Sequence, residues 1–392
     1  MIKVQTINNI SPIGLKKFSK ETYKVSSELT NPDVILVRSA TMHEMEIGEN
    51  LKAVARAGVG VNNIPLEKMN NHGVVVFNTP GANANAVKEL VISSMLLASR
   101  NICQAWNYVN NLPLENLKAT VEDGKKNYSG SELPGKTLGI VGLGAIGVEI
   151  ANAAHALGMN VIGFDPSITK KNAWKISADV EEALNVEELF SKSDFVSFHV
   201  PLVEGTKNLL NAKRIALLPK GAVVINLSRE GIVDEDALIE ALDSGKVKYY
   251  VTDFPINDKK NNERVIALPH LGASTAEAEV NCVIMVAKQI KDYLENGNIV
   301  NSVNFPEAKM PRAGEERLAI THKNIPNMVG QITNAIAEVG VNIVDMLNKS
   351  RDEVAYTLID LESEISDMAI DNLQQIDGIL TLRVLNQPVK EV

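Results

Sequence analysis

A histidine and an arginine that each follow a short apolar run have the residue types for acid–base chemistry on an anionic substrate. Arg229 comes two residues after the run Val223–Leu227, and His270 comes two residues after the run Val265–Leu268. Histidine titrates near physiological pH, so His270 can act as a general base or acid. The planar fork of an arginine matches a carboxylate, so Arg229 can hold an acidic substrate and polarise a developing carbonyl.

A carboxylate beside the histidine would orient its ring and favour its protonated form. Asp253 ends a third apolar run, and Asp258 and Glu263 are the acids available between it and His270. The pattern leaves open which of these two acids faces the ring. Two plainer interpretations also stay open. Arg229 can be a surface ion-pair partner, and His270 can be a residue that simply precedes a helix.

The other histidines carry weaker signals. His199 stands just before Pro201 among apolar residues, and a satisfied histidine at a strand end explains it at least as well as catalysis does. No motif surrounds His43, His72 or His155. No cluster of Cys, His and acidic residues has metal-ligand spacing, and no Gly-x-Ser-x-Gly or Walker motif is present. We therefore expect no metal site.

A glycine-rich turn predicts a dinucleotide site. Gly142 to Gly147 reads Gly-x-Gly-x-x-Gly between an expected strand, Thr137–Val141, and an expected helix, Ala145–Leu157. Asp165 follows the next strand, 23 residues after the first glycine. Glycines let the backbone approach a pyrophosphate at the helix N-terminus, and the aspartate can accept the ribose hydroxyls while repelling a 2′-phosphate. This favours NAD over NADP. Two features keep other interpretations open: a glycine turn can precede an unrelated aspartate, and lysines at 170 and 171 could support a phosphate.

The elements that must position these residues belong to an acidic chain of 392 residues. Lys and Arg total 39 against 48 Asp and Glu, a net charge of −9, which argues against nucleic acid and anionic membranes as partners. The 45% hydrophobic content provides for large buried cores, and the length suggests two or three domains. No apolar run has the length of a membrane span, and the N-terminal residues lack the apolar stretch of a signal peptide. The two cysteines, Cys103 and Cys282, cannot form a disulfide framework, so we expect a cytoplasmic location.

Short β-branched runs alternate with helical stretches along most of the chain, which predicts α/β architecture with parallel sheets. The stretch Asn83 to Asn110 reads as one long helix that is apolar around most of its surface, and we expect it to be buried between domains or subunits. The pattern changes after a Pro- and Gly-containing segment, residues 303–314. The order of elements there is strand, helix, strand, strand, helix, strand, a ferredoxin-like βαββαβ module.

Several motifs together resemble the D-2-hydroxyacid dehydrogenases and, among them, the phosphoglycerate dehydrogenase branch with a C-terminal ACT domain. The resemblance covers nearly the whole chain. The matching segments are Val37 to Thr41, Arg56 to Ile64, Asn78 to Gly81, Gly142 to Gly147, Asn226 to Arg229 and Pro269 to Thr275.

The resemblance implies two Rossmann-like domains and a regulatory ACT domain. The substrate-binding domain is expected to be discontinuous, comprising residues 1–95 and 276–302, with the NAD-binding domain, 96–275, inserted between its parts. A linker, 303–314, and the ACT domain, 315–392, follow.

The resemblance also implies roles for individual residues. Arg229 is expected to hold the substrate carboxylate, His270 to be the acid–base group, and Asp258 to be the acid that pairs with it, one methylene shorter than the family's usual glutamate. The expected NAD contacts are Gly142, Gly144, Ala145, Ile146, Gly147, Asp165, His199, Pro201, Thr206, Ser228 and Asp253. The expected substrate contacts, besides Arg229, are Arg38, Ser39, Gly58 and Asn78, with Arg38 a candidate for binding a phosphate.

The family's effector, L-serine, would be bound by His322, Asn324 and Asn342. Two departures from the family's pattern concern glycine positions. Glu230 follows the catalytic arginine where a glycine is usual, so this residue would be strained if the site needs a positive φ. Asn327 replaces the glycine of the effector loop, and asparagine tolerates left-handed backbone.

The resemblance, together with the strand-end residues, implies NAD-dependent oxidation of 3-phosphoglycerate to 3-phosphohydroxypyruvate, the first step of L-serine biosynthesis. We expect a homodimer or homotetramer, because ACT modules pair edge to edge. The alternatives are a reductase of glyoxylate, hydroxypyruvate or another 2-oxo acid, and a non-catalytic NAD-sensing scaffold. A scaffold would not need Arg229 and His270, so their presence favours an enzyme.

Overall fold

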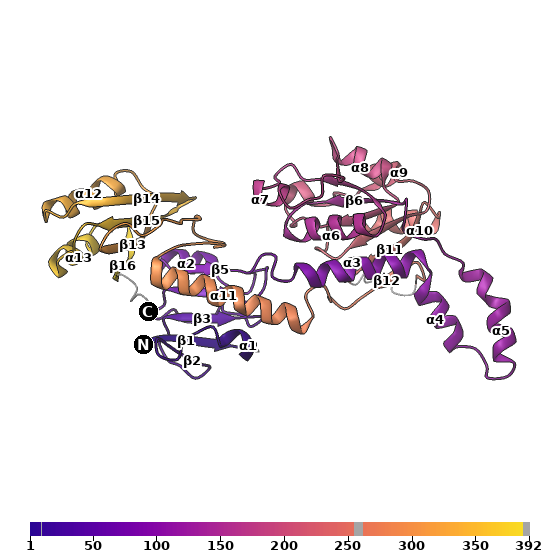
Figure 1. Ribbon diagram of the computed structural model, residues 1–392, viewed down its shortest axis with the longest axis horizontal. Helices are drawn as coiled ribbons and strands as arrows, with labels where there is room; N and C mark the ends of the chain where they lie inside the picture. Colours follow the sequence, from indigo (N-terminus) through magenta and orange to yellow (C-terminus); the bar gives the residue numbers. More distant parts are fainter. Residues whose placement is uncertain (9, 255–261, 387–392) are drawn as a thin grey trace. The chain divides into compact units, whose positions relative to one another are not determined.

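The computed structural model describes residues 1–8, 10–254 and 262–386 (Figure 1). The chain divides into two compact units, Met1–Ala82 with Glu279–Val392, and Asn83–Ala278. Each is described by itself. Among the described residues, no helix is long and apolar enough to cross a membrane.

The first unit contains a five-stranded parallel sheet in the order β2-β1-β3-β4-β5. Every residue of β3 and β5 is buried, as expected of strands in a parallel sheet covered on both faces. The strands are β1 (Ile2–Ile7), β2 (Tyr23–Ser26), β3 (Val34–Val37), β4 (Ala53–Arg56) and β5 (Val75–Phe77). The helices of this part are α1 (Pro12–Leu15), α2 (Leu66–Asn71) and α11 (Ala276–Asn296).

The same unit carries a four-stranded antiparallel sheet in the order β14-β15-β13-β16. Its elements are β13 (Glu316–Lys323), α12 (Met328–Glu338), β14 (Ile343–Arg351), β15 (Val354–Leu361), α13 (Asp367–Gln374) and β16 (Ile379–Asn386). The expected βαββαβ module is confirmed. One face of the sheet packs under α12 and α13, with Leu318 and Ile320 in that core. The other face packs on α11 through residues such as Ala319 and Tyr356.

The second unit is a seven-stranded parallel sheet in the order β12-β11-β10-β9-β6-β7-β8, the doubly wound arrangement predicted. Its strands are β6 (Thr137–Val141), β7 (Asn160–Phe164), β8 (Glu181–Glu182), β9 (Phe195–Phe198), β10 (Ala222–Asn226), β11 (Val247–Thr252) and β12 (Val265–Ala267). Its helices are α3 (Ala84–Ser99), α4 (Ile102–Asn110), α5 (Leu117–Gly124), η1 (Lys125–Tyr128), α6 (Ala145–Ala156), α7 (Lys170–Ala173), α8 (Val186–Lys192), η2 (Glu204–Thr206), α9 (Ala212–Leu217) and α10 (Glu235–Asp243).

The expected single helix from Asn83 to Asn110 is wrong. Asn101 adopts a left-handed conformation (φ 52°) and separates α3 from α4. Asparagine tolerates this conformation because its short amide can bond locally, and the Asn101 amide donates to the carbonyls of Tyr128 and Ser129. The apolar residues of α3 are largely buried, whereas α4 buries none of its residues within this chain. Its apolar surface includes Trp106, which is 70% exposed.

Three arginines of the C-terminal module satisfy the end of α11. The last carbonyls of a helix lack partners within the helix and attract cations. Arg383 donates to the Tyr293 carbonyl at 3.1 Å. Arg312 donates to that of Glu295 at 3.1 Å, and Arg317 to that of Asn296 at 2.9 Å. The module is therefore joined to α11 by polar contacts as well as by apolar packing.

One of these arginines forms a buried ion pair. The side chains of Arg317 and Asp360 are fully buried and meet through two hydrogen bonds, Nε to Oδ1 at 2.5 Å and Nη2 to Oδ2 at 2.8 Å. Burial alone would raise the pKa of Asp360, but hydrogen bonds from Arg317 and from the Ala313 N–H lower that pKa below its ordinary value. The carboxylate thus stays charged at neutral pH.

We predict that Asp360→Asn lowers the free energy of unfolding by about 3–5 kcal/mol, because it leaves the Arg317 charge buried without a counter-ion. A depressed folded pKa means that the Asp360 carboxylate contributes stability above its ordinary pKa of 3.8, and that this contribution is lost as the pH falls through the folded value. Urea unfolding at pH 7 measures the loss, with Asp352→Asn, an exposed aspartate, as the control. Equal urea midpoints for the two variants would contradict the predicted loss of stability.

Candidate active site

The glycine turn between β6 and α6 leaves backbone open to a ligand. Gly142 has φ 96°, and a Cβ there would lie 2.6 Å from the His199 carbonyl oxygen. A Cβ at Gly147 would collide with the Gly142 carbonyl, so both positions need glycine for the turn itself. A Cβ at Gly144 would meet no described atom within 4 Å beyond its own chain neighbours and helix backbone, so open space faces the N-terminus of α6. Ala145 and Ile146 form the first turn of that helix. This cradle fits a dinucleotide pyrophosphate.

Asp165 braces the turn from the end of β7. Its Oδ2 accepts the Leu143 N–H at 2.8 Å, and its Oδ1 accepts the Ser167 N–H at 2.9 Å. Each carboxylate oxygen keeps a further acceptor position. The side chain is therefore held in place and can still accept a ribose hydroxyl, as the sequence predicts.

The loop after β9 holds three more of the predicted cofactor contacts. The Thr206 hydroxyl donates to the Pro201 carbonyl at 2.6 Å and closes the loop. Burial lowers the pKa of His199 to about 3, so its ring is neutral at physiological pH. That ring bonds the Ser197 hydroxyl at 2.8 Å. The predicted contact Ser228, at the end of β10, donates to the Val200 carbonyl at 2.7 Å, which links the two loops.

Asp253 ties β11 to the segment that carries the histidine. Its Oδ2 accepts the Gly272 N–H at 3.0 Å, and its carbonyl accepts the His270 N–H at 3.0 Å. Among the described residues, its buried Oδ1 has no hydrogen-bond partner. An orphaned buried acceptor at a strand end fits a group that contacts a bound cofactor.

His270 is exposed and has a positive φ of 47°. Strained backbone of this kind recurs at functional sites, where surrounding bonds hold it. The ring packs against that of Phe254, with centroids 5.1 Å apart and an interplanar angle of 60°. The histidine is thus set by its backbone bonds and by one aromatic neighbour.

Arg229 extends from the turn after β10. The Asn226 side-chain amide donates to the Arg229 carbonyl at 2.9 Å, and this holds the turn. The positive φ in this turn falls on Gly231 (φ 81°), so the strain expected at Glu230 does not arise. Because β10 and β12 flank β11, neighbouring strand spacing puts their carboxyl ends about 10 Å apart. The sheet thus brings Arg229, Asp253 and His270 to the same carboxyl edge as the glycine turn after β6.

The contacts among the described residues do not identify the acid that pairs with His270. Asp258 lies outside the described residues. Glu263 precedes β12, whereas His270 follows it, so the two residues stand at opposite ends of that strand. The Glu263 carbonyl accepts from Gln104 of α4 at 2.7 Å, away from the carboxyl edge of the sheet.

In the first unit, the predicted substrate residues follow three neighbouring strands. Arg38 and Ser39 follow β3, Gly58 follows β4, and Asn78 follows β5. The loops are interlocked: the Asn78 amide donates to the Val59 carbonyl at 2.7 Å, and the Gly58 carbonyl accepts from the Thr79 N–H at 3.1 Å. The carboxyl edge of this sheet therefore gathers all four residues, as expected.

The predicted effector residues do not meet within one chain. His322 is buried and bonds the Thr357 hydroxyl at 2.8 Å. Asn324 is nearby in the chain and donates to the Asp352 carbonyl. Asn342 precedes β14 at the other end of the antiparallel sheet, about six residues, or 20 Å, along β13 from His322. Asn327 takes the left-handed conformation (φ 66°) that its position requires.

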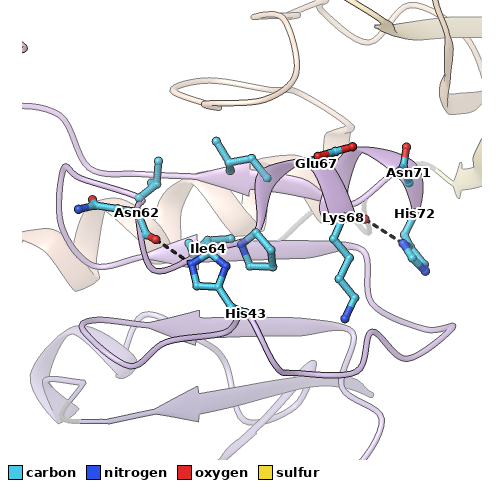
Figure 2. Close-up of a pocket in the computed structure, with 10 residues that line it drawn as sticks. His43, Asn62, Ile64, Glu67, Lys68, Asn71 and His72 are labelled. Atoms are coloured by element: carbon cyan, nitrogen blue, oxygen red, sulfur yellow. Dashed lines mark hydrogen bonds between the residues drawn. The ribbon is translucent and has the colours of Figure 1, made fainter. Parts of the chain in front are cut away.

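One surface hollow of the first unit, of about 610 Å³, borders α2 and includes His43 and His72 (Figure 2). The His43 ring bonds the Asn62 carbonyl at 2.9 Å, and the His72 ring bonds the Lys68 carbonyl at 2.8 Å. The two rings are thus anchored at different places and do not converge on a shared ligand, which agrees with the absence of any motif around them.

Three residues that contact predicted site residues were not found from the sequence. Phe254 packs on His270, Asn226 holds the arginine turn, and Glu279 of α11 pairs with Arg38 at 2.6 Å. Asn226 stands in a quoted motif, and its place at the end of a strand could have suggested a backbone tie. Glu279 carries no such signal, because its partner is 241 residues away in the chain.

Residues 92–272 match the family described as D-isomer specific 2-hydroxyacid dehydrogenase, NAD binding domain. The D-3-phosphoglycerate dehydrogenase of Haemophilus influenzae is 35% identical over 360 residues, which cover 88% of this chain and 84% of that protein. That of Methanocaldococcus jannaschii is 37% identical over 332 residues, which cover 82% of this chain and 60% of that protein. The chain thus spans less than two thirds of this longer relative.

A solved structure has a similar fold. The NAD⁺-bound 3-phosphoglycerate dehydrogenase of Entamoeba histolytica aligns with a TM-score of 0.60 and 29% identity, over 77% of this chain and 98% of that chain. The second unit therefore contains an NAD-binding domain.

Gly144→Ala is predicted to separate cofactor binding from folding. An alanine fits the local backbone (φ −69°, ψ −166°) and meets no protein atom, so stability should be unchanged. Its methyl would stand where a pyrophosphate approaches, and overpacking of about 1–3 kcal/mol should weaken NAD binding about 5- to 150-fold. Calorimetry with NAD and thermal unfolding measure the two effects. Gly147→Ala breaks the turn, so it should lose both NAD binding and stability. Unchanged NAD affinity in Gly144→Ala would refute this placement of the pyrophosphate.

Proposed function

The chain belongs to the D-isomer specific 2-hydroxyacid dehydrogenase family, and on that premise we propose that it oxidises 3-phosphoglycerate to 3-phosphohydroxypyruvate with NAD, the first step of L-serine biosynthesis. One observation carries the proposal: the carboxyl edge of a single sheet holds the glycine turn together with Arg229, His270 and Asp253, whose Oδ1 has no hydrogen-bond partner among the described residues. A cation, a proton acceptor and a dinucleotide cradle are the parts that oxidation of a 2-hydroxy acid requires.

His270 takes the proton of the substrate's hydroxyl on a ring nitrogen, and Arg229 donates hydrogen bonds to the substrate's carboxylate. Bound NAD would be held by the glycine turn and Asp165 and would supply the hydride acceptor for the carbon that bears the hydroxyl, so that this carbon becomes the ketone carbon. Arg229 also stabilises the negative charge that develops on the oxygen. Asp258 is the proposed partner of the protonated ring. Asp253 positions the histidine through its backbone carbonyl.

Arg38, Ser39, Gly58 and Asn78 are the proposed contacts of the first unit with the substrate. Arg38 is the group suited to a phosphate, because its fork can donate two parallel hydrogen bonds to phosphate oxygens. It is one-third exposed and faces Glu279. Because the Glu279 carboxylate is already paired with Arg38, a second candidate function is the reduction of a 2-oxo acid that carries no phosphate, such as hydroxypyruvate or glyoxylate.

Steady-state assay with NAD and 3-phosphoglycerate tests the function. We expect His270→Gln to lower kcat by about 10²- to 10⁴-fold, because the proton acceptor is lost. His155→Gln is the matched control, since that histidine is exposed and pairs with Asp179 on the surface. His199→Gln should keep the pH dependence above pH 5, because its ring is already neutral there. Turnover that survives His270→Gln undiminished would remove the mechanism.

We also propose that the chain forms a homodimer or homotetramer in the cytoplasm. Two surfaces support self-association. The apolar side of α4, with Ile102, Trp106 and Val109 at helical spacing, is exposed in this chain. Strand β14 forms an edge of its sheet and has mostly exposed residues. Free thiols at Cys103 and Cys282 suit a reducing compartment.

L-serine is the proposed effector. Its site would need two copies of the chain, because His322 and Asn324 lie at the opposite end of the antiparallel sheet from Asn342. Antiparallel pairing of two β14 edges would bring the start of one strand to the end of the other.

Light scattering combined with calorimetry tests the two-copy effector site. The chain is expected to run as at least a dimer and to release heat on addition of L-serine but not of D-serine. Asn342→Ala is expected to lose that heat and to keep the oligomeric state. A monomer that binds L-serine would contradict the two-copy site.

A further inference from the structure

We propose that Glu279 sets the charge of the substrate that the first unit accepts, by competing with the substrate's phosphate for Arg38. The inference rests on the proposed function and deepens it. Its starting point is the ion pair between Arg38 Nη1 and Glu279 Oε1, 2.6 Å long, at the carboxyl edge of the first sheet.

The two charges are held there by rigid parts of the unit. The Arg38 carbonyl accepts from Arg56 Nε at 2.9 Å, which fixes the loop after β3. Glu279 belongs to the first turn of α11, and the next turn is buried through Cys282 and Val283. A Cβ at Gly14 would lie 2.5 Å from the Val283 side chain, so this part of α11 packs closely against α1. Glu279 is therefore carried by a part of α11 that packs closely against its own unit.

The site's charge depends on this carboxylate. With Glu279 ionised, the carboxylate cancels the charge of the Arg38 guanidinium in the ion pair. Without that carboxylate, the Arg38 guanidinium would present its full positive charge to a ligand. A phosphate must bring its negative charge next to Glu279 and replace that carboxylate on Arg38.

A substrate without a phosphate escapes this competition. Its carboxylate is bound by Arg229 of the second unit, in the mechanism proposed above, and it makes no demand on Arg38. Glu279 thus opposes phosphorylated substrates selectively and leaves unphosphorylated 2-hydroxy acids unaffected. This makes Glu279 a specificity-determining residue that acts through Arg38 and does not take part in the proton or hydride transfer.

The exposure of the Arg38–Glu279 pair sets the expected size of the gain in phosphate binding. The side chains of Arg38 and Glu279 are 33% and 41% exposed, so water and salt screen the pair. Partly exposed pairs are weak, and removing the competition should strengthen phosphate binding by about threefold to fivefold. The gain should shrink as ionic strength rises.

The test compares the wild type with Glu279→Gln, which keeps the shape and removes the charge. For 3-phosphoglycerate we expect KM to fall about threefold to fivefold with kcat unchanged, and for D-glycerate, which lacks the phosphate, no change in either constant. Glu277→Gln, an exposed acid on the same helix, is the matched control and should match the wild type. In the double variant with Arg38→Ala, the gain in Glu279→Gln should disappear.

Each possible result of the Glu279→Gln experiment supports the inference or overturns it. An unchanged KM in Glu279→Gln, while the wild type oxidises 3-phosphoglycerate, overturns the inference and leaves the proposed function standing. A raised KM would mean that Glu279 orients Arg38 for the substrate, which also overturns it. If neither protein oxidises 3-phosphoglycerate, the proposed function fails, and calorimetry with 3-phosphoglycerate then decides the inference. Tighter binding by Glu279→Gln supports it, and equal binding refutes it.

Discussion

A parallel sheet delivers the carboxyl ends of neighbouring strands to one edge, and every part of the candidate site depends on this constraint. In the second unit it groups residues from four stretches of sequence: the glycine turn after β6 and the side chains after β10, β11 and β12. In the first unit it groups the loops after β3, β4 and β5. The order of the strands alone therefore brings the residues of the candidate site to one edge, and each loop contributes one or two polar groups.

Backbone ties then convert exposed loops into defined positions. His270 and Arg229 are both exposed, yet the main chain of each is bonded to a buried neighbour, Asp253 in one case and Asn226 in the other. Side chains that react must be accessible, whereas the groups that hold them must be shielded from water for their bonds to be strong. Asp253 serves both purposes: one oxygen of its carboxylate supports the loop, and the other, Oδ1, has no hydrogen-bond partner among the described residues.

The sequence predicted the parts of the fold and site that depend on local pattern. Buried β-branched runs such as Val34–Val37, the glycine turn and the C-terminal βαββαβ order were recognisable because each is encoded within a few adjacent residues. The break at Asn101 was missed because the apolar pattern continues across it, and the bonds that stabilise the turn come from residues 27 and 28 positions away. The pairing of Glu279 with Arg38 was missed for the same reason. Tertiary partners of a single polar side chain leave no periodicity to detect.

The arginine contacts at the end of α11 make the C-terminal module part of the architecture of the first unit. A chain that stopped before Arg312 would leave the carbonyls of Glu295 and Asn296 without these arginine donors, and the Tyr293 carbonyl with only the Gly297 N–H. It would also uncover apolar surface on a helix that spans about 30 Å. The opposite end of that helix holds Glu279. A premature stop codon in this region would therefore act as a folding lesion in the first unit, and the module could not be exchanged between chains as a self-contained cassette.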